Sequence, residues 1–363
     1  VISHIANSAE ETFETMLLMD LTVSEEAPPE NTGESRMVGT LNFAGYIIGI
    51  IYIQITGEYG YRMVAGMQGI EPSEVESINE VKDLLAEITN IVGGNLKSAL
   101  NDAGFPCVLS TPAITFGTDF TIKSLNMERY ERYVFDHEDD SVFIEVGLKS
   151  QEVSEDGAEF GATDISGRLQ DVDVEKINAL NYKAKIEDAM IDVFDTMISL
   201  DLETAESISG DSLDGLRNMA SVCFGGDATG IVNIQVSDKF SRIMAASMLG
   251  MEPGEIEGQE EIVDLLGELS NIIGGSLKSA LTDAGLACAL STPSFTTGTD
   301  FEIELLNLER YERFAFKYDI HTVFVEMGIK ISDLAKVADQ SGKEVHYDVT
   351  DTDQAPDCLL YTS

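Results

Sequence analysis

Hydrophobic and polar positions follow two different periods along this chain. Apolar side chains recur at helical spacing over residues 1–19, 58–69 and 74–103, which predicts a first helix, a short helix and a long helix. Residues 35–56 are instead rich in Ile, Val, Tyr and Phe, which is typical of two strands joined by a turn. The first part of the chain therefore mixes helices with paired strands.

Four more strands are predicted after the long helix. The first two, 107–115 and 120–126, are separated by Gly117-Thr118-Asp119, whose residue types favour a hairpin turn. The other two, 129–136 and 142–148, are separated by an acidic turn. We therefore expect the α/β (α+β) class, with a mainly antiparallel sheet packed on long helices.

The whole pattern recurs at a shift of 181 residues. Asp20 matches Asp201, Pro112 matches Pro293, and no gap is needed between residues 16 and 147. A period of this length indicates two whole domains that arose by duplication, not a solenoid. We predict copy one at 1–150, an acidic linker at 151–173, copy two at 174–331 and a C-terminal tail at 332–363.

The charge balance limits the class of partner. Lys and Arg total 22 against 65 Asp and Glu, which gives a formal net charge of -43. Such a field repels nucleic acid and anionic membrane surfaces, so neither is expected as a partner. It is compatible with a protein partner that presents a cationic surface, and it also fits a plain role in solubility.

Cysteine usage indicates the redox compartment. The four cysteines form no CxxC pair, and Cys107 and Cys288 lie in apolar strand-like runs, so we expect buried reduced thiols. No charged leader with an apolar core opens the sequence, and no apolar run reaches the ~18 residues that a membrane span needs. We therefore expect a cytoplasmic protein.

Several common catalytic sets are missing from the sequence. The four histidines have neither metal-ligand spacing nor a nucleophile to serve, so no metal site is expected. Residues 93–98 partly match a phosphate-binding loop, but they lack its full spacing and lie inside a helical pattern. The frequent methionines fit core positions on helices.

One polar stripe follows the long helix. Asp83, Glu87 and Asn90 stand at i, i+4 and i+7, which returns to one face of an α-helix, and the next turn reaches Gly94. We call these four residues, with their counterparts in copy two, the polar stripe. The counterparts are Asp264, Glu268, Asn271 and Gly275.

The stripe has a functional and a structural interpretation. A polar stripe is also what the solvent face of any amphipathic helix presents. Two adjacent glycines within a helix cost ~1 kcal/mol each relative to alanine, and both copies keep them as Gly93-Gly94 and Gly274-Gly275. Close approach of a partner backbone and tight helix packing both explain such a pair.

The stripe carries a resemblance to a known family. Asp83-x3-Glu87-x2-Asn90, followed further on by Pro112, resembles the signature of the CheC/CheX/FliY chemotaxis phosphatases, and copy two repeats it with Pro293. With one motif in each copy, the chain is most similar to a tandem duplication of CheX. The tandem departs from the family, whose CheX members are single domains that self-associate. Intramolecular pairing of the copies and a homodimer are therefore both open.

The resemblance implies a reaction and its residues. Members of the family hydrolyse the aspartyl phosphate of a response-regulator receiver, CheY, which brings its own Mg²⁺, so no cofactor of this chain is expected. By resemblance, Asn90 and Asn271 position the attacking water, while Glu87 and Glu268 pair with a receiver Lys. The residues expected to bind the partner are Asp83, Gly93, Gly94, Asp264, Gly274 and Gly275.

Two other functions remain open from the sequence. The same family fold contributes to flagellar switch proteins, so the tandem could be a scaffold that binds a receiver without catalysis. Two intact Glu–Asn pairs favour the enzyme over this scaffold. A small-molecule sensory domain is a third class, but the sequence indicates no convergent polar pocket for a ligand.

Overall fold

The computed structural model describes residues 2–17, 19–24, 33–150, 180–205, 213, 215–306 and 308–331. The predicted linker at 151–173 and tail at 332–363 lie outside this set, so the three boundaries between the four predicted segments stay predictions. Within the described residues, the two copies contain the same elements in the same order.

Copy one alternates helices and strands as the periodicity predicted. A short helix and a long helix are inserted between the third strand and the remaining four strands. The elements are α1 (Ile2–Leu17), β1 (Thr22–Ser24), β2 (Arg36–Gly45), β3 (Ile47–Thr56), α2 (Gly57–Gln68), η1 (Pro72–Glu74), α3 (Ile78–Asp102), β4 (Cys107–Leu109), β5 (Ala113–Ser124), β6 (Arg129–His137) and β7 (Asp140–Ser150).

Copy two repeats these elements with one local difference. Its first helix ends in a π-helical turn, where copy one continues as a regular α-helix. The elements are α6 (Tyr182–Val193), η3 (Phe194–Ile198), β8 (Glu203–Ala205), β9 (Arg217–Gly226), β10 (Ala228–Ser237), α7 (Asp238–Leu249), η4 (Pro253–Glu255), α8 (Glu260–Asp283), β11 (Cys288–Leu290), β12 (Ser294–Leu305), β13 (Arg310–Tyr318) and β14 (His321–Ile331).

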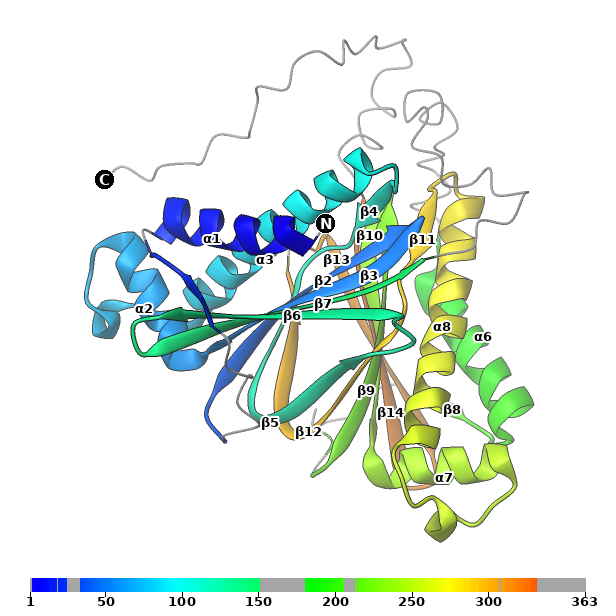
Figure 1. Ribbon diagram of the computed structural model, residues 1–363. Coiled ribbons are helices and arrows are strands. Elements are labelled where there is room, and N and C mark those ends of the chain that lie inside the picture. The colour runs from blue at the N-terminus through cyan, green and yellow to red at the C-terminus, as the bar shows by residue number, and fades with distance from the viewer. Residues whose placement is uncertain are drawn as a thin grey trace.

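The two copies pair with each other through their strands. The described strands form one 14-stranded sheet in the order β1-β6-β7-β3-β2-β5-β12-β9-β10-β14-β13-β8, with β4 beside β2 and β11 beside β9. This order reads the same in both copies from the central β5–β12 pair outwards, so the copies are related by a pseudo-twofold axis. Figure 1 shows the helices of both copies on the outside, with the strands between them. The two copies therefore pair within one chain through β5 and β12, and the homodimer stays a prediction.

The predicted hairpin turn at Gly117-Thr118-Asp119 is wrong, because β5 runs through these residues as one strand. In this stretch β5 pairs with β12 of the other copy and the register shifts. A Cβ at Gly117 would collide with the carbonyl oxygen of Asp300. The same side-chain contact is made in both directions between the two strands. The hydroxyl of Thr118 donates to Asp300, and that of Thr299 donates to Asp119, each at 2.5 Å. The turn-forming residue types therefore serve a close contact between strands.

Among the described residues, buried apolar side chains form three cores. In each copy, the strands of that copy pack one face against its three helices. In copy one, for example, Leu41 of β2 lies in the same core as Phe13 of α1 and Leu85 of α3. A third core lies between the copies, on the sheet faces that point away from the helices. Its buried members are Val38, Ile50, Tyr52, Phe120, Met219 and Phe301.

Cys223 lies in the contact between the copies, where the side-chain amide of Asn42 donates to its sulfur at 3.0 Å. These two residues are equivalent under the 181-residue shift, so they face each other near the pseudo-twofold axis. Burial raises the pKa of the Cys223 thiol to about 12. Cys107 and Cys288 are also free and buried, which confirms the expectation of buried thiols for the cysteines that the structure describes.

Cys223 is therefore expected to resist alkylation until the copies separate. At pH 8 a thiol with a pKa near 12 is ionised to only about 10⁻⁴, whereas a free cysteine with a pKa of about 8.5 is ionised to roughly a quarter. Iodoacetamide labelling with peptide mass spectrometry, in native buffer and in urea, measures this. Fast labelling of Cys223 in native buffer would contradict the closed pairing of the copies.

Candidate functional site

The long helix of copy one begins later than its apolar pattern suggested. Residues Pro72–Glu74 form the separate turn η1, and α3 begins after Ser77. The hydroxyl of Ser77 accepts from the N–H of Asn79, and the carboxylate of Glu80 accepts from the N–H of Ser77 at 3.1 Å. Such a capping box satisfies helix N–H groups that have no intrahelical partner, so it fixes the start of α3.

The inner face of α3 is held firmly against the sheet. Leu85, Ile88 and Val92 are completely buried in the copy-one core. The polar stripe therefore lies on the opposite face, where Asp83 and Glu87 are exposed and Asn90 is half-buried. Within the part of copy one that the structure describes, the side chains of these three residues have no hydrogen-bond or ion-pair partner, so they are available to a visiting molecule.

Copy two repeats this arrangement on α8. Asp264 and Glu268 are exposed and Asn271 is half-buried. Among residues 180–205, 213, 215–306 and 308–331, these side chains also have no polar partner. Figure 1 shows α3 and α8 as separate helices on different sides of the strands, so each copy carries its stripe on a helix of its own.

The tandem glycines divide into two kinds, which corrects part of the sequence expectation. Gly93 and Gly274 are buried, and a Cβ at either would collide with the sheet, at Leu41 in copy one and Val222 in copy two. They allow the helix to approach the sheet, so they do not form a surface for a partner. The neighbouring Gly94 and Gly275 are half-buried, and a Cβ at either would meet no atom within 4 Å.

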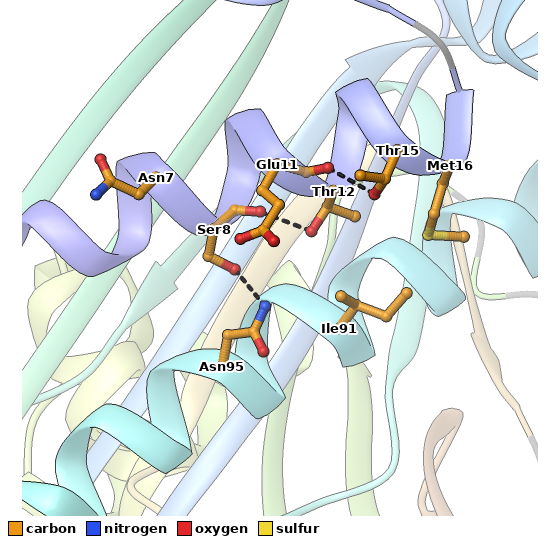
Figure 2. Close-up of a pocket in the computed structure, with 8 residues that line it drawn as sticks. All are labelled: Asn7, Ser8, Glu11, Thr12, Thr15, Met16, Ile91 and Asn95. Carbon is orange, nitrogen blue, oxygen red and sulfur yellow. Dashed lines mark hydrogen bonds between the residues drawn. The ribbon is translucent and has the colours of Figure 1, made fainter. Parts of the chain in front are cut away.

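A cleft of about 490 Å³ lies beside the stripe of copy one, between α1 and α3. Figure 2 shows the side-chain amide of Asn95 reaching across it to the Ser8 hydroxyl, to which it donates at 2.8 Å. Ile91 lines the cleft and directly follows Asn90. The sequence expectation did not include this cleft. The only signal for it was Ser8 and Thr12 on the apolar face of the first helix, where copy two has Ala189 and Val193.

The described residues include neither a metal-binding cluster nor a membrane-spanning helix. In the described ranges, no three His, Cys, Asp or Glu side chains gather where they could hold a metal ion. Among the helices of those ranges, none is both long enough and apolar enough to cross a bilayer.

The chemistry available at the stripe is that of a carboxylate beside a carboxamide. An ionised Glu accepts hydrogen bonds and attracts a cation, whereas an Asn amide both donates and accepts. An amide is no general base at neutral pH, so its contribution to a reaction is orientation. The stripe lies on a surface that is open to another molecule.

Comparison with protein families gave one match that covers both copies. The model described as "Chemotaxis phosphatase CheX" matches residues 37–136 and 219–317, which is more than half of the chain. Both segments include the polar stripe of their copy. Comparison with curated protein sequences gave no significant match.

Solved structures similar to this chain include chemotaxis proteins. CheX from Vibrio vulnificus is 20% identical over 42% of this chain and 97% of its own, with a TM-score of 0.36. The CheX-CheY-BeF3-Mg complex from Borrelia burgdorferi is 16% identical over 41% of this chain and 97% of its own, with a TM-score of 0.33. FliY from Thermotoga maritima is 16% identical over 42% of this chain and 87% of its own, with a TM-score of 0.28.

Proposed function

The chain belongs to the CheX family of chemotaxis phosphatases, and from this premise we propose that it hydrolyses the aspartyl phosphate of a CheY-type receiver. The observation that carries the proposal is the pair of identical Glu–Asn stripes, each exposed on a rigid helix with no polar partner among the described residues. In both copies the stripe runs beside a glycine that leaves open space for a partner.

Asn90 and Asn271 are assigned the positioning of the attacking water. An acyl phosphate is already labile, so little more is needed than a water held in line with the phosphorus. The Asn carbonyl oxygen accepts a hydrogen bond from this water, and its N–H donates to a phosphoryl oxygen. Mg²⁺ belongs to the receiver in this mechanism and neutralises charge on the phosphoryl group.

Glu87 and Glu268 are assigned the docking register. Each lies one turn before its Asn, so a Lys of the receiver that pairs with the carboxylate fixes the distance from receiver to Asn. Gly94 and Gly275 leave open space one turn further on, into which the receiver backbone fits. Asp83 and Asp264 add exposed carboxylates at the edge of this surface.

The test is the release of phosphate from a phosphorylated CheY-type receiver with Mg²⁺, with the chain present at about one-tenth of the receiver concentration. We expect several receivers to be dephosphorylated by each chain, faster than the receiver loses phosphate alone. Tight binding without faster decay would instead support the scaffold. Neither binding nor acceleration, across several receivers, would reject both functions.

A further inference from the structure

Each site helix rests partly on the other copy. Leu306, directly after β12, packs against the core of copy one, and Leu125, directly after β5, packs against that of copy two. Gly267 of α8 allows a close approach, because a Cβ there would lie 2.7 Å from the Leu125 side chain. The copies therefore support one another's helices at the β5–β12 contact.

Copy one adds an ion pair to this support. Lys82 lies on the inner face of α3, and its side chain is 8% exposed. Its Nζ lies 2.5 Å from the carboxylate of Glu304 on β12 and 4.0 Å from the ring centroid of Phe116. A charge so far removed from water needs such a partner, because an unpaired buried ammonium is strongly unfavourable.

Copy two has no equivalent of this ion pair. The 181-residue shift carries Lys82 to Val263, Phe116 to Thr297 and Glu304 to Lys123. The side chain of Lys123 is exposed. All three members of this contact therefore differ in copy two, so at the equivalent positions the charged contact joins α3, and not α8, to the other copy.

We propose that Lys82 and Glu304 are positioning residues for the copy-one site, and that the two sites of the chain are therefore not equivalent. The inference rests on the proposed function. Lys82 precedes Asn90 by eight residues, or about 12 Å along the helix axis. Because an α-helix moves as a rigid body over that length, holding its inner face also fixes the direction of Asn90 on its outer face.

The test separates the sites by silencing one at a time. Asn271→Ala leaves only site one, and Asn90→Ala leaves only site two. In the first background, Lys82→Met is expected to lower kcat for receiver dephosphorylation by roughly tenfold with little change in KM, because misplacement of a positioning group affects the reaction step. In the second background it is expected to change nothing. The charge-swapped pair Lys82→Glu with Glu304→Lys is expected to restore site one.

Hydrogen exchange of the same variants gives a readout independent of activity. Lys82→Met is expected to speed amide exchange in α3 and not in α8, whereas Lys123→Met, the matched control, is expected to change neither. An equal loss at both sites, or unchanged kcat at site one, would overturn the inference. If neither background accelerates dephosphorylation at all, the proposed function fails, and the exchange rates alone then decide whether the tether exists.

Discussion

Replacing Asn90 and Asn271 together with alanine is expected to abolish catalysed dephosphorylation while the protein stays folded. Neither side chain has a polar partner among the described residues, and alanine is the better helix former, so the free energy of unfolding should not fall. Losing the group that orients the water should cost about 100-fold or more in kcat. Receiver turnover and circular dichroism on the same samples measure both effects.

The single variants divide the activity between the copies. Each of Asn90→Ala and Asn271→Ala should keep the activity of the other site and lose its own. Asn95→Ala is the matched control, because Asn95 lies on the same helix but points to Ser8 across the cleft. A folded double variant that still dephosphorylates receivers would remove both asparagines from the mechanism.

Local periodicity was enough to predict the helices and the orientation of the stripe. The helical spacing of apolar residues located α3 and α8, and it placed Asp83, Glu87 and Asn90 on the outer face because that spacing is a property of the helix itself. The duplication was equally visible, and the family match covers both copies.

Contacts between distant segments could not be predicted in this way. Gly117-Thr118-Asp119 has the composition of a turn, and only the approach of β12, about half the chain away, makes it a strand. The Lys82–Glu304 ion pair joins residues 222 apart. The one signal for it was a lysine on the inner side of the predicted helix, and this signal does not indicate which residue is its partner.

Gly93 was misassigned for a different reason, which lies in the helix geometry. At 100° per residue, Gly94 continues the stripe, whereas Gly93 continues the inner row through Lys82 and Thr89. A glycine pair therefore always spans two faces. Opposite consequences of substitution are expected for its two members.

Gly93→Leu is expected to destabilise the protein, whereas Gly94→Leu is not. A side chain at Gly93 would collide with Leu41 and force α3 away from the sheet, which should cost about 3 kcal/mol. A side chain at Gly94 enters open space and gains up to about 1 kcal/mol of helix propensity. Urea unfolding of the two variants measures this difference. Equal destabilisation would contradict the finding that Gly93 is packed against the sheet while Gly94 faces open space.

The same pair tests where the receiver docks. If Gly94 receives the receiver backbone, Gly94→Leu in the Asn271→Ala background should raise KM strongly while the protein remains as stable as its parent, because the leucine fills the space that the partner needs. Gly275→Leu with Asn90→Ala is the corresponding variant of copy two. Unchanged KM in both would move the docking surface away from these glycines and leave Glu87 and Glu268 to set the register alone.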